Sequence, residues 1–385
     1  MKQFLRIISY VLVAALASFL TLCVTQPIQQ PEQPSKLETL ESLILEQFVG
    51  EADPTAMGDA AAEAMVASLG DRWSYYIPAS QYGQYTQQMN NAYVGIGITI
   101  SARETSDGFT IDVVEQNGPA QEAGLLPGDI IIAVEGQSVV GMTINDVSEL
   151  VRGEEGTTLT VTVQRGEEEL TFTVERRQIK VTVATGVLLE GNVGLVTIEN
   201  FDERCAEETI AAIESVLEQG ATSLLFDVRY NPGGYKRELV DVLNYLLPEG
   251  PLFRSQYYDG REVVDSSDAD CLDVPMAVLV NGSSYSAAEF FAAAIREYDA
   301  GFVVGTQTCG KGYFQNTIKL PDGSAVGLSV GKYSTPNGVC LADVGGLTPD
   351  VVVEVDDETA AKIYAGTLEP ENDPQIQAAL EKLRS

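Results

Sequence analysis

The stretch Val278 to Gln315, VLVNGSSYSAAEFFAAAIREYDAGFVVGTQTCGKGYFQ, decides the fold and the chemistry of this chain. Its first apolar run predicts a buried strand that ends at Asn281-Gly282, and the alanine-rich run from Ala287 predicts a helix. Ser286 lies at the turn between them, where the unpaired N–H groups of a helix N-terminus can stabilise an oxyanion. We therefore interpret Ser286 as a candidate nucleophile.

The base that such a serine needs cannot be histidine, because the sequence contains none. This excludes a Ser-His-Asp triad and imidazole zinc sites, and it leaves a Ser-Lys pair as the variant of the same logic. Lys311 stands between Gly310 and Gly312, which would let the backbone approach another element closely. Taken alone, the same pattern also fits an ordinary loop lysine. We expect neither a metal nor a cofactor.

Length and charge limit the number of domains and the classes of function that remain possible. A chain of 385 residues predicts two or three domains, and its 45% hydrophobic content is typical of globular protein. The net charge of −33 argues against nucleic-acid binding, which needs clustered Lys and Arg.

The first 24 residues predict a signal anchor. Lys2 and Arg6 precede the uncharged, mostly apolar run Ile7 to Val24, which is just long enough to span a bilayer. Residues 25–35 are a Pro/Gln-rich linker. This predicts a single-pass protein of the cell membrane, with the rest of the chain outside the cytoplasm. Leu20 to Cys23 leaves a lipoprotein alternative open.

Beyond the anchor, four cysteines remain: Cys205, Cys271, Cys309 and Cys340. They allow three complete pairings, or four free thiols, and the sequence does not choose among these.

Residues 36–91 predict a helical segment with an aromatic end. Apolar residues recur near helical spacing in residues 36–50, and residues 54–69 are rich in alanine. Residues 70–88 hold the only tryptophan, Trp73, and several tyrosines. The segment is too small for a large core, so we expect it to pack on another domain or on a second subunit, which would make a homodimer.

Residues 92–178 change to short strands with two helices, Pro119 to Gly124 and Thr143 to Arg152. With the stretch Gly124 to Gln137, GLLPGDIIIAVEGQ, this segment resembles a PDZ domain, a β-sandwich-like fold. The resemblance implies that a peptide C-terminus adds beside the sheet edge and that backbone N–H groups hold its carboxylate. The candidate peptide-binding residues are Tyr93, Val94, Gly95, Ile96, Gly97, Ile98, Val147, Leu150 and Val151. Their apolar side chains, some of which equally fit a core, predict tails that end in an apolar residue.

Residues 179–385 alternate strands and helices, which predicts an α/β domain. Three motifs here resemble those of the carboxyl-terminal processing proteases: Asp227 to Gly234 (DVRYNPGG), Ser284 to Glu289 (SYSAAE) and Gly310 to Gln315 (GKGYFQ). The resemblance covers nearly everything from Leu37 onward. Tyr285, Ala288 and Cys309 depart from the usual residues beside the site, which affects substrate preference more than activity.

The resemblance implies roles for six residues. Ser286 is the nucleophile, Lys311 its base, and Gln315 an acceptor that orients the lysine. The oxyanion donors are the backbone N–H groups of Ala287 and of Gly233 or Gly234. Lys311 must be neutral to act, so burial has to lower its pKa from about 10.4. The sequence thus predicts a multidomain α/β serine endopeptidase that acts on proteins with free apolar C-termini.

Three other readings remain. Gly305 to Gly312 misses a phosphate-binding P-loop by one residue, with Gly312 where a hydroxyl must bind magnesium. Ser329 and Lys332 have the penicillin-binding Ser-x-x-Lys spacing but lack its companion motifs. The third is a non-enzymatic PDZ adaptor with a degenerate protease domain, which would not react with a serine-directed phosphonate.

Overall fold

The computed structural model describes residues 34–103 and 107–384. The chain divides after Met65 into two compact units. The predicted anchor, Ile7 to Val24, lies outside the described residues. Among those described, no helix is both long and apolar enough to cross a membrane.

The N-terminal unit contains α2 (Lys36–Gln47) and most of α3 (Pro54–Ala67). Ser35 caps α2, because its hydroxyl accepts from the backbone of Glu38 while the Glu38 carboxylate accepts from Ser35 N. The predicted helices are confirmed, and residues 36–91 are divided between the two units. Their aromatic end forms β1 (Tyr75–Ile77) and α4 (Ala79–Met89), and β1 pairs with a strand of the second unit.

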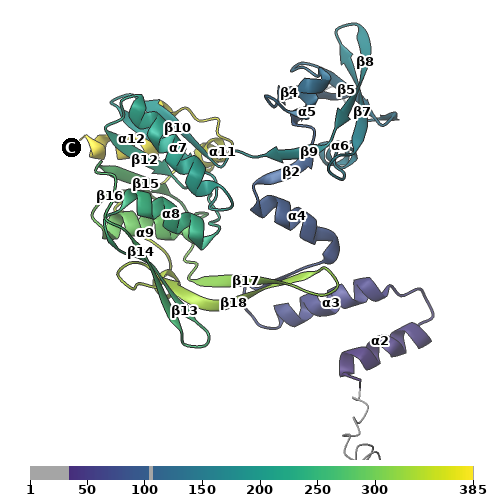
Figure 1. Cartoon of the computed structure of the whole chain (residues 1–385), viewed down its shortest axis with the longest axis horizontal. Coiled ribbons are helices and arrows are strands. Elements are labelled where there is room, and N and C mark those ends of the chain that lie inside the picture. Colours follow the sequence, from purple (N-terminus) through teal and green to yellow (C-terminus); the bar gives the residue numbers. More distant parts are fainter. Residues whose placement is uncertain (1–33, 104–106, 385) are drawn as a thin grey trace, which may run out of the picture. The chain divides into compact units, whose positions relative to one another are not determined.

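The second unit is built around a six-stranded sheet in the order β10-β11-β12-β15-β16-β19 (Figure 1). Every pair in it is parallel except β10 with β11. The strands are β10 (Ala184–Leu189), β11 (Val193–Ile198), β12 (Ser223–Asp227), β15 (Met276–Val280), β16 (Gly301–Gly305) and β19 (Val351–Val352).

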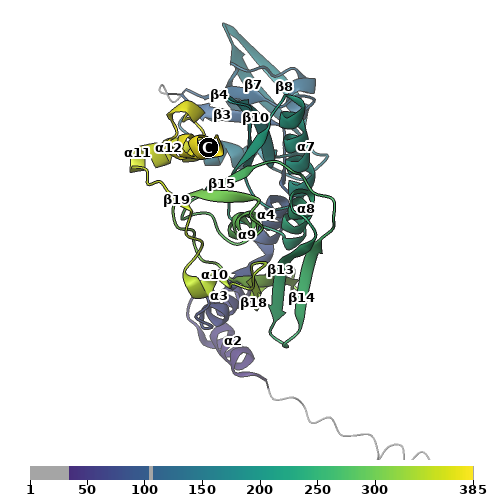
Figure 2. The same cartoon turned by 90° about the vertical axis from the view of Figure 1, so that its left-hand side faces the viewer.

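The two faces of this sheet follow from the alternation of side chains along a strand. On β15, Val278 packs in the core with α7 (Cys205–Glu218), α8 (Lys236–Leu246) and α9 (Ala287–Glu297). Its neighbour Leu279 packs in a second cluster with α12 (Pro374–Leu383). Figure 2 shows α12 on one side of β15 and α7 and α8 on the other. Both faces are covered, so the inner strands read as continuous apolar runs.

A second sheet has the order β1-β18-β13-β14, with β17 on β18. Its remaining strands are β13 (Gly250–Tyr257), β14 (Glu262–Ser267), β17 (Tyr313–Lys319) and β18 (Ala325–Ser334). The short helices α10 (Leu341–Val344) and α11 (Asp357–Tyr364) follow it in the chain. This sheet matters for the site because β17 begins two residues after Lys311.

The predicted PDZ segment has its own sheet, β3-β4-β5-β7-β8 with β6 on β5, and its own core around Ile111 and Val161. Two helices, α5 (Pro119–Ala123) and α6 (Ile144–Val151), complete it. The strands are β3 (Ile98–Ala102), β4 (Phe109–Val114), β5 (Ile130–Val134), β6 (Gln137–Ser138), β7 (Thr158–Arg165) and β8 (Glu168–Glu175). Strand β2 (Ala92–Gly95) precedes this sheet in the chain and strand β9 (Arg177–Lys180) follows it, and the two pair with each other.

The four cysteines named above are free thiols in the structure. The pairing that the sequence left open is thus absent from the part of the chain that the structure describes.

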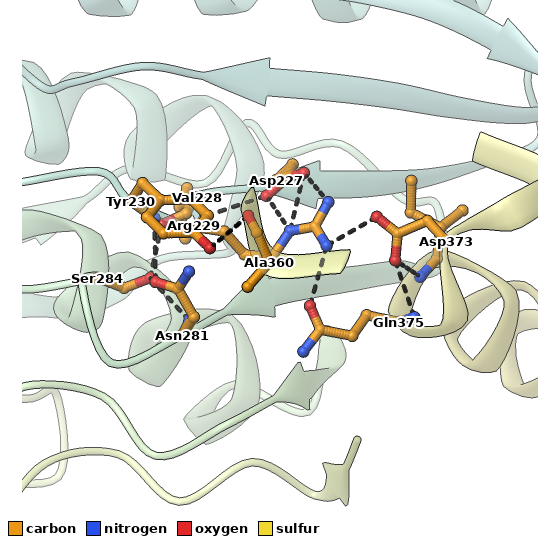
Figure 3. Close-up of polar contacts among 10 residues, drawn as sticks. Asp227, Val228, Arg229, Tyr230, Asn281, Ser284, Ala360, Asp373 and Gln375 are labelled. Atoms are coloured by element: carbon orange, nitrogen blue, oxygen red, sulfur yellow. Dashed lines mark hydrogen bonds and ion pairs between the residues drawn. The ribbon is translucent and has the colours of Figure 1, made fainter. Parts of the chain in front are cut away.

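A buried arginine joins the C-terminal helix to the end of β12 (Figure 3). Arg229 pairs with Asp227 at 2.5 Å and with Asp373 at 2.8 Å, and its guanidinium also donates to Gln375 Oε1. Asp373 in turn caps α12, since its carboxylate accepts from Gln375 N and Ile376 N. Asp373 therefore pairs with a buried guanidinium and also accepts hydrogen bonds from the first turn of α12.

We predict that Asp373→Ala lowers the free energy of unfolding by about 3 kcal/mol, because it breaks a buried pair and removes a cap. Asp356→Ala is the matched control: Asp356 caps α11 at an exposed position, so its loss should cost clearly less than that of Asp373. Urea denaturation of both variants measures the difference. Equal losses would mean that the Arg229 pair contributes nothing.

Candidate active site

Ser286 lies on a sharp turn between β15 and α9. Its φ of 59° and ψ of −126° fall in a region that L-residues rarely adopt, at a cost of about 1–3 kcal/mol. Two contacts hold the turn: the buried Ser284 hydroxyl donates to Val228 O at 2.7 Å, and Tyr285 N donates to Asn231 O. The strained geometry presents the Ser286 side chain at the helix N-terminus, as the sequence predicted.

The Ser286 hydroxyl accepts a hydrogen bond from the phenol of Tyr333, on β18, at 2.9 Å. Tyr333 is buried, and burial raises its pKa, so the phenol keeps its proton and remains a donor. The described residues include no hydrogen bond between Ser286 and Lys311. In this conformation the Ser286 oxygen is therefore hydrogen-bonded to Tyr333 and not to Lys311.

Lys311 lies between two aromatic rings. Its Nζ is 4.7 Å from the centroid of the Trp73 ring and 5.8 Å from that of Tyr285. Burial lowers the pKa of Lys311 to about 8. Lys311 lies on the loop between β16 and β17, and Trp73 lies in the aromatic segment that precedes β1. The aromatic contacts and the lowered pKa both follow from the packing of these two segments.

Glu289 connects the serine turn to the lysine loop. Its fully buried carboxylate accepts from Ser286 N at 3.0 Å and from Lys311 N at 2.9 Å through Oε2. Its Oε1 accepts from Gly310 N and from the Thr308 hydroxyl. Desolvation raises the pKa of Glu289, and these four hydrogen bonds oppose that rise by favouring the carboxylate.

The two glycines of the DVRYNPGG motif lie against the serine turn. A Cβ on Gly233 would stand 2.7 Å from Ser286 Cβ and 2.9 Å from Ala287 N, so only glycine allows this approach. Gly233 N already donates to Asn231 Oδ1 at 2.8 Å. Of the two predicted glycine donors, Gly233 N is therefore already used, which leaves Gly234 N. The oxyanion role of Gly234 and Ala287 stays a prediction.

Gln315 departs from its predicted contact. Its Nε2 donates to Ser329 Oγ at 3.0 Å and to Tyr313 O, and the described hydrogen bonds include none from Lys311 to Gln315. Gln315 and Lys311 nevertheless line the same cavity as Ser286.

That cavity has a volume of about 560 Å³. Aromatic side chains dominate its wall, and its charged residues are Asp202, Lys236, Arg237 and Lys311. Among the described residues, no three His, Cys, Asp or Glu side chains gather as metal ligands would. The polar groups present suit attack by a hydroxyl on a carbonyl carbon.

The PDZ segment carries a separate groove of about 240 Å³. Seven of the nine predicted residues line it: Tyr93, Val94, Gly95, Ile96, Gly97, Ile98 and Val151. The structure differs at Val147, which is fully buried in the PDZ core, and at Leu150, which packs against that core. The apolar face of α6 turns inward there, so Ser148 and Arg152 line the groove instead.

Sequence reasoning missed three residues of the site. Tyr333 and Trp73 are 47 and 213 positions from Ser286, so neither lies in a motif with it. Glu289 ends the SYSAAE motif, but the motif by itself assigns no role to it. An acidic residue at the third position of an apolar helix was the available signal, because a buried charge needs partners.

Comparisons with known proteins identify the family of this chain. Residues 192–353 match the model of peptidase family S41, and residues 110–165 match that of the PDZ domain. The chain is 32% identical over 371 residues to the carboxy-terminal processing protease CtpA of Bacillus subtilis (strain 168), covering 93% of this chain and 79% of that one.

A probable CtpA-like serine protease of Staphylococcus aureus (strain COL) is 30% identical over 324 residues. That match covers 83% of this chain, which spans only 64% of the length of the staphylococcal relative. A crystal structure of a candidate S41 protease from Bacteroides fragilis shares the fold, with a TM-score of 0.54 and 18% identity, over 92% of this chain and 99% of the other. The chain therefore belongs to peptidase family S41.

Proposed function

We propose that this chain is a membrane-anchored, extracytoplasmic serine endopeptidase that binds protein C-termini in its PDZ groove and cleaves near them with Ser286 and Lys311. The observation that carries the proposal is the shared cavity: a strained serine, a lysine whose pKa is lowered to about 8, and a glycine turn packed on the serine. The Bacillus relative, a carboxy-terminal processing protease, supports the same reading.

In the proposed reaction, neutral Lys311 accepts the proton of Ser286 as its oxygen attacks the peptide carbonyl. The N–H groups of Ala287 and Gly234 then stabilise the oxyanion, and the lysine returns the proton to the leaving amine. Glu289 positions both partners through their backbones. Water hydrolyses the acyl-enzyme with the lysine again as base.

The reaction requires a rearrangement from the conformation described here. Lys311 must leave the face of Trp73, and Ser286 must exchange its contact with Tyr333 for one with the lysine. We propose that an engaged C-terminal tail favours this change by binding the aligned state more tightly.

The contacts at the base of the PDZ segment offer a route for that coupling. Asn91, just before β2, exchanges two side-chain hydrogen bonds with Asn200. The next residue, Phe201, donates its N–H to Gly233 O at 2.8 Å and pairs with Gly234. A shift of β2 would thus reach the proposed oxyanion turn through two successive contacts, which the peptide bond between Asn200 and Phe201 connects.

Ser286→Ala and Lys311→Ala should each lower kcat by about 10⁴- to 10⁶-fold while the protein stays folded, and the double variant should be no worse than either. The measurement is hydrolysis of an unfolded protein substrate. Ser283→Ala and Lys319→Ala change exposed residues of the same types and should keep wild-type rates. Full activity in Ser286→Ala would overturn the assignment of the nucleophile.

The pH profile tests the base. Since Lys311 acts only when neutral, kcat/KM should rise about tenfold per pH unit below about pH 8 and level off above it. Asp202 also lines the cavity, and its pKa is raised to about 7, so its titration would give a similar profile. If Lys311 is the titrating base, the midpoint should be unchanged in Asp202→Asn. A midpoint that disappears in that variant would assign the titration to Asp202 instead.

The groove is tested with one unfolded substrate, prepared with a free or an amidated C-terminus. Amidation removes the carboxylate that backbone N–H groups would hold, so cleavage should slow at least about tenfold. Val151→Asp places a like charge in the groove and should erase the difference. Val140→Asp, at an exposed valine of the same domain, should preserve it. Equal rates for both substrates in the wild type would contradict C-terminal recognition.

A further inference from the structure

Asp202 is a buried carboxylate in the wall of the cavity that contains Ser286. The residue is 8% exposed, and its Oδ1 has no hydrogen-bond partner among the described residues. A buried polar atom without a partner costs free energy, so such atoms are uncommon unless a ligand completes them.

Asp202 does not cap the helix that follows it. It stands three positions before α7, whose N-cap residue is Arg204. Here Glu238, on α8, accepts from Ala206 N at 2.9 Å in the first turn of α7. The Asp202 side chain is therefore left to face the cavity.

The backbone fixes Asp202 relative to the serine. A Cβ on Gly234 would stand 2.6 Å from Asp202 N, and Gly233 packs on Ser286 Cβ. Asp202 N itself donates to Asn200 Oδ1. The backbone of Asp202 is thus held beside the glycine turn.

The surroundings of Asp202 suit a cation. Tyr235 and Tyr285 line the same cavity. Burial raises the pKa of each phenol, and the charge of Asp202 adds to the rise. Aromatic rings together with a carboxylate in one cavity are a common environment for ammonium and guanidinium groups. Burial, followed by the charge of Glu238, raises the pKa of Asp202 to about 7, so an arriving cation would hold it ionised.

The cations already in the cavity have other partners. Lys236 pairs with Asp265 at 2.7 Å, and Arg237 pairs with Glu203. Lys311 lies over Trp73. None of these side chains makes an ion pair with Asp202 in the described part of the chain.

We propose that Asp202 is a specificity-determining residue that binds a basic side chain, lysine or arginine, of the substrate close to the scissile bond. This inference rests on the proposed peptidase function and adds a substrate class to it. The tail that enters the PDZ groove and the side chain that reaches Asp202 would be separate determinants of one substrate.

The test is a set of N-acetylated peptides in which each position around the scissile bond carries lysine, norleucine, glutamine or glutamate in turn. Acetylation leaves the side chain as the cation under test. At one position, wild-type kcat/KM should be about ten- to a hundredfold higher for lysine than for norleucine, the range of a charge-assisted contact. The ratio should fall to near one in Asp202→Asn and in Asp202→Ala.

Asp241→Asn is the matched control, because Asp241 is an exposed aspartate on α8 that does not line the cavity. It should keep the wild-type ratio. An unchanged ratio in Asp202→Asn would overturn the inference, and so would a uniform loss for all peptides, which indicates a structural or main-chain role. Equal rates for glutamine and lysine would also overturn it, since a neutral donor would then suffice.

A binding measurement separates this inference from the proposed function. In full-length Ser286→Ala, fluorescence anisotropy should show that the lysine peptide binds at least about tenfold more tightly than the norleucine peptide, and adding Asp202→Asn should remove the difference. This arm requires no catalysis. If wild-type protein hydrolyses nothing while the difference in affinity remains, the peptidase proposal fails and the assignment of Asp202 stands.

Discussion

The four hydrogen bonds to the Glu289 carboxylate are the interaction on which the site depends. The serine turn and the lysine loop come from different strands. Cys309 N donates to Ser284 O, and the buried Glu289 side chain joins the backbones of Ser286 and Lys311 themselves. A carboxylate is suited to the task, because each oxygen accepts two bonds and the charge strengthens all four. Desolvation works against the charge, so the loss of one donor would weaken the whole set.

The contacts around Lys311 explain how a folded site remains misaligned. A buried cation–π contact contributes about 2 kcal/mol, whereas a typical hydrogen bond contributes about 1 kcal/mol net. The lysine therefore gains no free energy by leaving the Trp73 ring for Ser286, whose hydroxyl already accepts a hydrogen bond from Tyr333. Such a near balance suits control by a ligand, since about 1.4 kcal/mol of differential binding shifts the populations tenfold.

The region around Phe201 connects the features that the proposals use. Its backbone bonds to the glycine turn, its neighbour Asn200 contacts the base of the PDZ segment, and its other neighbour, Asp202, enters the cavity. A tail in the groove and a basic side chain in the cavity would thus act on the same short loop. This arrangement places substrate selection and alignment of the proposed oxyanion turn in one structural element.

The sequence by itself determined the local features. The apolar runs of β12 and β15 and the helix after Ser286 follow from period and turn chemistry, whereas the PDZ segment was identified by its resemblance to a family. The absence of histidine left lysine as the base of the predicted site. Only the tertiary structure decided which groups meet. It moved Val147 into a core, directed Gln315 to Ser329, and placed Tyr333 and Trp73 against the two proposed catalytic side chains, Ser286 and Lys311. The physical reason is that period and motif depend on neighbours in the chain, whereas hydrogen-bond partners and burial depend on residues brought together across two sheets.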